Sequence, residues 1–188
     1  MKLLIAIVAL SMLSGCVAVI AGGAAVSAVT VGEDPRTLGT QIDDTTRASD
    51  IRSALGDVPA FDQNANIDVH VFNGIALLHG QALNSNLKAK AEQVVKSASD
   101  VTVVHNQIRI ANNIASTTRA HDVWLSSKVR GSLLTNDSVN SLLIDVIVED
   151  SEVFLMGIVT PNQAAKAIEV SRNINGVVKV FNVFEIKE

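Results

Sequence analysis

The chain has 188 residues, with 15 Lys and Arg against 19 Asp and Glu, and a net charge of −4 at pH 7. This acidic balance, without a basic stripe, argues against a nucleic-acid-binding protein. The hydrophobic content of 48% is raised by residues 1–31, so composition alone does not indicate an integral membrane protein.

The chain begins with Met-Lys and the apolar run LLIAIVALSML, which has the length of a signal-peptide core. Cys16 follows in the sequence LSGC and is the single cysteine, which excludes an intramolecular disulfide. LSGC resembles the lipobox of bacterial lipoproteins, which are cut before the cysteine and acylated there, with chains such as palmitate. The resemblance implies a signal peptide over 1–15, an anchor at Cys16 and, because Val17 follows instead of Asp, delivery to the outer membrane. An uncleaved transmembrane helix over Leu3–Val31 is the alternative, since this segment is apolar and long enough.

Residues 16–43 are predicted to form the acylated N-terminus and a polar linker or ordered collar, because EDPRTLGTQIDDTTR contains Pro, Gly and many polar residues. Beyond this segment the sequence repeats. IDVHVFNGIALLHGQA from Ile67 aligns with IDVIVEDSEVFLMGIV from Ile144 at an offset of 77 residues. Blocks on either side align at offsets of 78 and 76. Three blocks in the same order indicate a duplicated unit, and we expect domains over 44–112 and 120–188.

Each unit has the same predicted order of elements. A helix with apolar residues four apart precedes a strand that alternates apolar and polar residues from Ile67. Asn73-Gly74 predicts a two-residue hairpin turn, which the polar tip 149–152 replaces in the second copy. A second helix and a closing strand complete an α-β-β-α-β unit. The fold class is therefore α+β, with two helices on one face of a three-stranded sheet in each unit.

Two glycines, Gly80 and Gly157, occupy matching ends of the returning strands. We predict that each marks a bulge or close packing against the following helix, and not a ligand site. Each unit is near the lower size limit for an independent core, so docking of the two units against each other is also expected.

The α-β-β-α-β unit with its apolar-x-apolar-x-Gly strand end resembles the BON domain. Two such units behind a lipobox, with DPRTLGTQIDD from Asp34 and SEVFLMGIVT from Ser151, resemble the family of outer-membrane lipoproteins with two BON domains. The resemblance covers essentially the whole mature chain. It implies a non-enzymatic protein without a cofactor, held on the periplasmic face of the outer membrane. It also implies binding of anionic phospholipids, such as phosphatidylglycerol and cardiolipin, and a role in envelope integrity and at the division site.

The two copies differ in their first helix. The second copy has Trp124, the single tryptophan, where the first has Thr46, and Lys128 where the first has Asp50. On a helix Trp124 lies about 100° from the core stripe, with Lys128 one turn further along. This pair suits a membrane interface, where an indole lies at headgroup depth and an ammonium meets phosphate. The alternative is that Trp124 packs under the other unit or the linker.

The family resemblance places lipid contact on this helix. The candidate phospholipid-binding residues are Trp124, Leu125, Ser127, Lys128, Val129 and Arg130. Residues 120–188 carry six basic and nine acidic side chains, so binding is expected to be weak, salt-sensitive and dependent on local orientation. An acyl anchor would make weak binding sufficient.

Signals for catalysis are few. The sequence lacks a Gly-x-Ser-x-Gly elbow, a Gly-rich phosphate loop and a His-x-x-x-His pair, so no catalytic or metal site is expected. The four histidines fall in different predicted elements: His70, His79, His105 and His121. We expect His70 to be solvated on the polar side of its strand, and Asp43, Asp44 and Asp145 to lie on turns or strand surfaces.

Two functions of different classes remain. The first is an acyl-anchored lipid-binding module that acts through the helix around Trp124. The second is a protein adaptor for an outer-membrane assembly, division or cell-wall complex.

Overall fold

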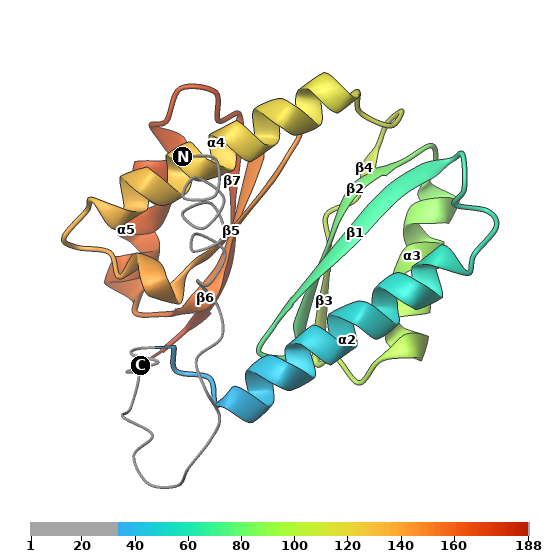
Figure 1. The fold of residues 1–188 in the computed structure, drawn as a ribbon, viewed down its shortest axis with the longest axis horizontal. Coiled ribbons are helices and arrows are strands. Elements are labelled where there is room, and N and C mark those ends of the chain that lie inside the picture. The colour runs from blue at the N-terminus through green and yellow to red at the C-terminus, as the bar shows by residue number, and fades with distance from the viewer. Residues whose placement is uncertain (1–33, 188) are drawn as a thin grey trace, which may run out of the picture. The chain divides into compact units, whose positions relative to one another are not determined.

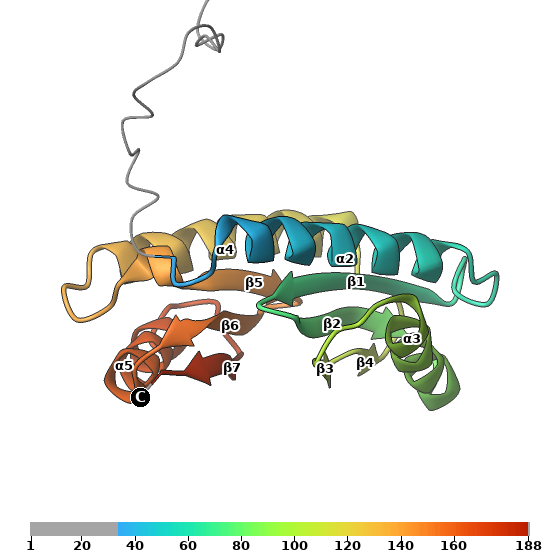
Figure 2. The same ribbon diagram turned by 90° about the horizontal axis from the view of Figure 1, so that it is seen from below.

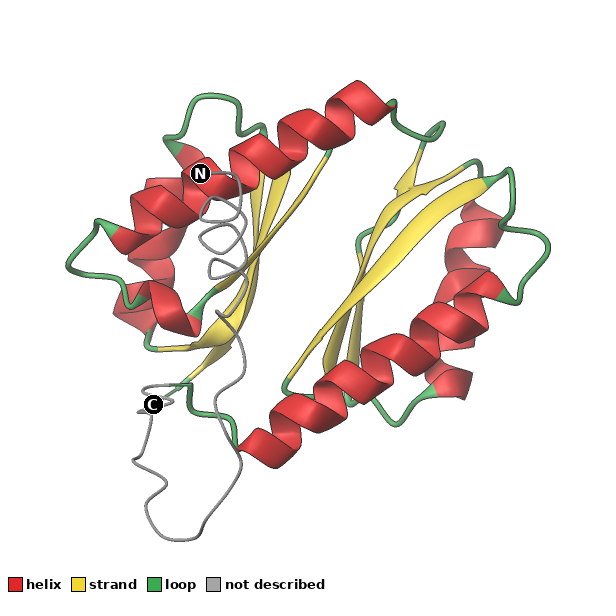
Figure 3. Ribbon diagram, in the orientation of Figure 1, coloured by secondary structure: helices red, strands yellow, loops and turns green. Residues whose placement is uncertain are grey.

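The computed structural model describes residues 34–187 (Figure 1). The predicted signal peptide, Cys16 and the alternative membrane helix Leu3–Val31 therefore lie outside the described residues. Contacts divide the chain into Met1–Gly32 and Glu33–Glu188, and the second part contains both repeated units. Each unit folds as α-β-β-α-β, and Figure 3 separates the helices from the strands.

The first unit consists of a helix, a hairpin, a second helix and a closing strand in two pieces. Its elements are α2 (Leu38–Gly56), β1 (Ala65–Phe72), β2 (Ile75–Ala82), α3 (Ser85–Ala98), β3 (Val103–Asn106) and β4 (Arg109–Ile110). β1 is antiparallel to β2, and β3 and β4 both pair parallel with β2. The predicted closing strand is present, but an interruption at 107–108 makes this a four-stranded sheet.

The second unit repeats this arrangement with a continuous closing strand. Its elements are α4 (Ser116–Leu134), the short 3-10 helix η2 (Ser141–Leu143), β5 (Asp145–Glu149), β6 (Glu152–Val159), α5 (Pro161–Arg172) and β7 (Lys179–Ile186). β5 is antiparallel to β6, β7 is parallel to it, and the sheet has three strands. The α+β fold class with two tandem units is confirmed.

α2 begins earlier than the sequence suggested. Thr37 caps the helix, because its side chain accepts a hydrogen bond from the Thr40 backbone N–H at 3.1 Å. Residues 38–43 are therefore helical, although they were assigned to the linker. Pro35 lies before the cap, where it does not interrupt the helix.

The hairpin turns are held by a buried carboxylate that recurs in both units. Asn73 and Gly74 have φ angles of 49° and 74°, which confirms the predicted two-residue turn. Asp44 accepts hydrogen bonds from the backbone N–H groups of both, at 2.6 and 2.9 Å. Asp122 does the same for the turn at 150–151, at 2.8 and 2.9 Å. The expectation that Asp44 is a surface acid is therefore wrong, because it is 3% exposed and ties the first helix to the hairpin.

The matching glycines Gly80 and Gly157 allow close approach of a backbone segment that precedes them in the chain. A Cβ on Gly80 would lie 2.0 Å from the carbonyl oxygen of Asn66, and one on Gly157 would lie 2.1 Å from that of Leu143. Their φ angles are +110° and +153°, where side chains are strained. The close packing is thus against β1 for Gly80 and against the end of η2 for Gly157, and not against the following helix as expected.

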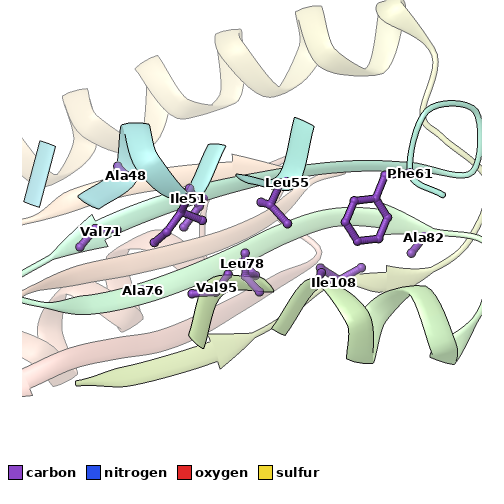
Figure 4. Close-up of a cluster of buried hydrophobic side chains, with 12 residues drawn as sticks. Ala48, Ile51, Leu55, Phe61, Val71, Ala76, Leu78, Ala82, Val95 and Ile108 are labelled. Carbon is purple, nitrogen blue, oxygen red and sulfur yellow. The ribbon is translucent and has the colours of Figure 1, made fainter. Parts of the chain in front are cut away.

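The described residues contain two domain cores and a third apolar cluster between them. Figure 4 shows the first core, in which Ile51 and Leu55 of α2 meet Leu78 of β2 and Val95 of α3. The second core is its counterpart under α4 and α5. The third cluster joins the units on the opposite sheet faces and consists of Phe72, Leu77, Phe154, Met156 and Val183. The sheets are therefore buried on both faces in their centres, and the expected docking of the units is observed.

Candidate lipid-contact helix

α4 has one fully buried face and one exposed apolar face. Its buried face is the stripe of Leu125, Val129 and Leu133, each with 0% exposure. On other sides of the helix Val123 and Trp124 are 69% and 53% exposed. Trp124 is therefore not packed under the first unit; the other alternative was packing under the linker, most of which lies outside the described residues. An exposed indole on a regular helix is free to meet a surface outside the described residues.

Lys128 and His121, one helical turn after and before Trp124, both lie beside its ring. The Lys128 Nζ is 4.9 Å from the indole centroid, in cation–π contact, and donates a hydrogen bond to the Asn175 carbonyl at 3.0 Å. The His121 ring lies one turn earlier, with its centroid 5.5 Å from the indole. The pairing of Trp124 with Lys128 suggested by the sequence is thus formed, and His121 was missed. Its position three residues before Trp124 was the available signal.

Two of the candidate lipid-binding residues cannot reach a lipid while the domain is folded. Leu125 and Val129 are fully buried in the second core, so the structure removes them from the candidate surface. The physical reason is helical periodicity, which turns these positions inward when Trp124 points outward.

Arg130 has a structural contact that both units share. Its Nη2 donates a hydrogen bond to the Val146 carbonyl, as Arg52 does to the Val69 carbonyl in the first unit. The repeated contact ties the first helix to the first strand of each unit, so it gives no reason to assign Arg130 to lipid. Ser127 is exposed and donates to the Val123 carbonyl at 3.1 Å. Of the candidates, Trp124, Ser127 and Arg130 are exposed and Lys128 is partly exposed, and Cys16 lies outside the described residues.

A shallow groove of about 360 Å³ runs beside the exposed face of α4. Arg119, Val123 and Ser126 line it from the helix, and Glu149 lines it from β5. The groove combines a cation, an anion and apolar carbon, so its surface is chemically mixed.

The interface between the units contains two histidine–carboxylate pairs. His70 Nε2 lies 2.9 Å from Asp145 Oδ2, and His79 Nδ1 lies 3.3 Å from Glu149 Oε2. Gln81 also donates to Glu149, at 2.6 Å. The expectation that His70 is simply solvated and Asp145 merely on the surface is therefore wrong. The sequence could not reveal this pair, because its members are 75 residues apart.

Both carboxylates are more acidic than usual. Burial opposes ionisation of Glu149, but the hydrogen bonds from His79 and Gln81 outweigh it and lower the pKa. Burial likewise opposes ionisation of Asp145, and the His70 hydrogen bond with nearby positive charge gives a net lowering of its pKa. Both groups are thus held as anions where the units meet.

Within residues 34–187, no cluster of three or more His, Cys, Asp or Glu side chains could hold a metal ion. In the same range, no helix is both long and apolar enough to cross a bilayer.

Comparisons with known proteins agree with the repeat. Residues 43–112 and 121–188 each match the BON domain family. The chain is 36% identical over 184 residues to the Outer membrane lipoprotein DolP of Haemophilus influenzae, covering 98% of this chain and 95% of that protein. It is also 36% identical over 150 residues to a 21 kDa hemolysin of Actinobacillus pleuropneumoniae, covering 80% of this chain and 77% of that protein.

Among solved structures, the C-terminal domain of CdsD, a structural protein of the type III secretion system of Chlamydia trachomatis, matches 78% of this chain and 68% of its own. The identity is 15% and the TM-score is 0.31, values too low to support any inference about fold or function from this likeness. The two family matches and the extended similarity to DolP agree with the duplicated α-β-β-α-β fold. The chain therefore belongs to the BON domain family, in its DolP-like form with two BON domains.

Proposed function

We propose that the chain is an outer-membrane lipoprotein that binds anionic phospholipid through the exposed face of α4 and supports envelope integrity without catalysing a reaction. Acyl groups on Cys16 would anchor it, with both BON domains in the periplasm. Similarity to a protein named as an outer-membrane lipoprotein over 98% of the chain supports the location. The LSGC sequence supports the anchor.

The exposed Trp124 beside Lys128 carries the proposal for lipid binding. A 53% exposed indole leaves much apolar surface in water, and insertion at headgroup depth would remove it from water. Lys128 Nζ, 4.9 Å from the ring, would then lie at the level of the phosphates. This geometry favours an anionic membrane over a neutral one.

The affinity of α4 alone should be low. Each cation near an anionic surface contributes about 1 kcal/mol, and insertion of part of one indole contributes roughly 2 kcal/mol. Such binding becomes useful when an anchor keeps the domain near the membrane, because the second contact is then intramolecular.

The test uses the fragment Glu33–Glu188, which contains both cores and excludes Cys16. Trp124 is the single tryptophan, so its fluorescence reports on α4 directly. We expect a blue shift and flotation with vesicles containing phosphatidylglycerol or cardiolipin, and neither with phosphatidylcholine alone. Trp124→Glu should abolish flotation and Lys128→Glu should weaken it.

Two matched controls separate these effects from general changes in charge or hydrophobicity. Lys90→Glu makes the same charge change on exposed α3, and Ile110→Glu replaces an apolar side chain that is 59% exposed. Neither control should alter flotation. If Trp124→Glu floats like the unmodified fragment, or if neither anionic lipid is bound, α4 is not a lipid-contact site.

A protein adaptor is the second candidate. The mixed groove beside α4, with Arg119 from α4 and Glu149 from β5 in its lining, suits a polypeptide with both charges better than a uniformly anionic lipid surface. The partner would belong to an outer-membrane assembly, division or cell-wall complex. A stoichiometric complex that survives detergent, and that Arg119→Glu disrupts, would favour this function over lipid binding.

A further inference from the structure

α2 also carries an exposed apolar pair. Leu38 and Ile42 are 64% and 65% exposed, although both are large aliphatic residues. They are four positions apart, so their side chains lie next to each other on the helix. Isolated exposed aliphatic residues are common, but two on successive turns form a continuous apolar surface.

The same side of α2 continues without a charged residue. Helical spacing aligns the pair with three exposed hydroxyl residues further along the helix, Thr45, Ser49 and Ser53. Asp43 and Asp50 lie on one flank of this stripe, and Arg52 lies on the other, where it is paired with Asp68 at 2.7 Å. A surface of this kind would contact lipid by burying apolar carbon, since its acidic flank would repel anionic headgroups and its one flanking cation is already paired.

The arrangement of the helices indicates what this surface contacts. α2 and α4 lie in the same layer, in front in Figure 1 and along the top in Figure 2, whereas β3 and β4 lie on the other side. In sequence, Leu38 follows Cys16 by 22 residues. A lipid anchor at Cys16 would therefore keep the start of α2 within reach of the bilayer that α4 is proposed to contact.

We propose that Leu38 and Ile42 form a second bilayer-contact surface, which inserts into the membrane by apolar burial while α4 supplies the contact with anionic headgroups. This inference rests on the proposed function for the membrane and the anchor. Two contacts on one side of the protein restrict how it lies on the membrane, and each raises the effective affinity of the other. The contribution of Leu38 and Ile42 to binding is insensitive to salt, because these side chains carry no charge.

Removal of the apolar pair should weaken binding without disturbing the fold. In the fragment Glu33–Glu188, the double variant Leu38→Ser with Ile42→Ser should bind phosphatidylglycerol vesicles about 10-fold more weakly, or about 1.4 kcal/mol. This factor of lost affinity, relative to the unmodified fragment, should be the same at low and high salt. The factor of affinity lost in Lys128→Glu should become smaller as salt rises, because salt screens the lost charge interaction. An unchanged affinity of the double variant would overturn the inference.

A labelling experiment separates this inference from the proposed function. The fragment Glu33–Glu188 has no cysteine, so a polarity-sensitive fluorophore can be attached at Ile42→Cys, Ser127→Cys or Ile110→Cys. We expect blue shifts at positions 42 and 127 with phosphatidylglycerol vesicles, and none at 110. A shift at 127 alone would overturn the inference and leave the α4 proposal intact. A shift at 42 alone would support the inference against the α4 proposal, and no shift at either position would overturn both.

Discussion

Replacement of Gly80 by alanine tests whether the two strands of the first hairpin approach as closely as the structure indicates. Gly80 lies opposite Ile67 in the β1–β2 register, and a Cβ there would be 2.0 Å from the Asn66 carbonyl oxygen. That distance is far below van der Waals contact, and the atom it meets is backbone, which cannot rotate away. The strands must therefore separate or the carbonyl must tilt out of the ladder.

The expected cost combines backbone strain with lost strand pairing. A non-glycine residue held at a φ of +110° costs about 1–3 kcal/mol. Each ladder hydrogen bond lost when the strands part costs about 1 kcal/mol more. We therefore expect Gly80→Ala to lower the free energy of unfolding by roughly 3–5 kcal/mol, a large part of a typical total.

Urea unfolding of the fragment Glu33–Glu188, followed by circular dichroism, measures this loss. Gly157→Ala should have a similar effect, because its Cβ would lie 2.1 Å from the Leu143 carbonyl oxygen. Gly131→Ala is the matched control, since Gly131 lies in helix α4 and has no neighbour within 4 Å of its added Cβ. Alanine favours a helix over glycine, so this control should raise stability by up to about 1 kcal/mol.

Gly80→Ala and Gly131→Ala are expected to change the free energy of unfolding in opposite directions. If Gly80→Ala costs less than about 1 kcal/mol, the close approach to the Asn66 carbonyl does not exist in solution. If Gly131→Ala destabilises the fragment as much as Gly80→Ala, the loss reflects a general intolerance to substitution and not the overlap.

Three further predictions concern the interface and the turns. Phe154 lies in the cluster between the units, and its ring is stacked 4.6 Å from that of Phe181. Phe154→Ala should lower the free energy of urea unfolding by about 3 kcal/mol, and a loss below about 1 kcal/mol would argue against docking in solution. Asp122→Asn weakens two charge-assisted bonds to the second turn and should cost about 1–2 kcal/mol by the same measurement, whereas no loss would contradict its role. The pKa values of Glu149 and Asp145 are lowered on folding, so their contribution is present above the unfolded pKa of about 4 and is lost as pH falls through the lower folded pKa. The free energy of unfolding should fall below about pH 4, and it should fall less steeply in Glu149→Gln. If the dependence of this free energy on pH is equally steep in both proteins, Glu149 does not contribute to the effect.

Local patterns predicted the elements of each unit but not all of their ends. Ile51 and Leu55 were expected on one helix face, and both lie in the first core with at most 5% exposure. Asn73-Gly74 predicted its turn because few residues tolerate two consecutive positive φ angles. The start of α2 was missed. Its first residues are polar and include a glycine, which indicated a linker, but the Thr37 cap starts the helix at Leu38.

The candidate site was predicted only in outline. The sequence alignment singled out Trp124 and Lys128, and the structure brings them to within 4.9 Å. The family resemblance also included Leu125 and Val129, and helical geometry buries both. A motif carried over from a family marks a stretch of chain, whereas the rotation of the helix decides which of its side chains reach the surface.

The sequence by itself determined the duplication, the α-β-β-α-β order and the inward face of each helix, because these depend on residues close together in the chain. Only the tertiary structure decided that the free sheet faces meet, that His70 pairs with Asp145, and that Trp124 stays uncovered by the first unit. Apolar periodicity specifies that a face must be covered, but the choice of what covers it depends on contacts between residues distant in sequence.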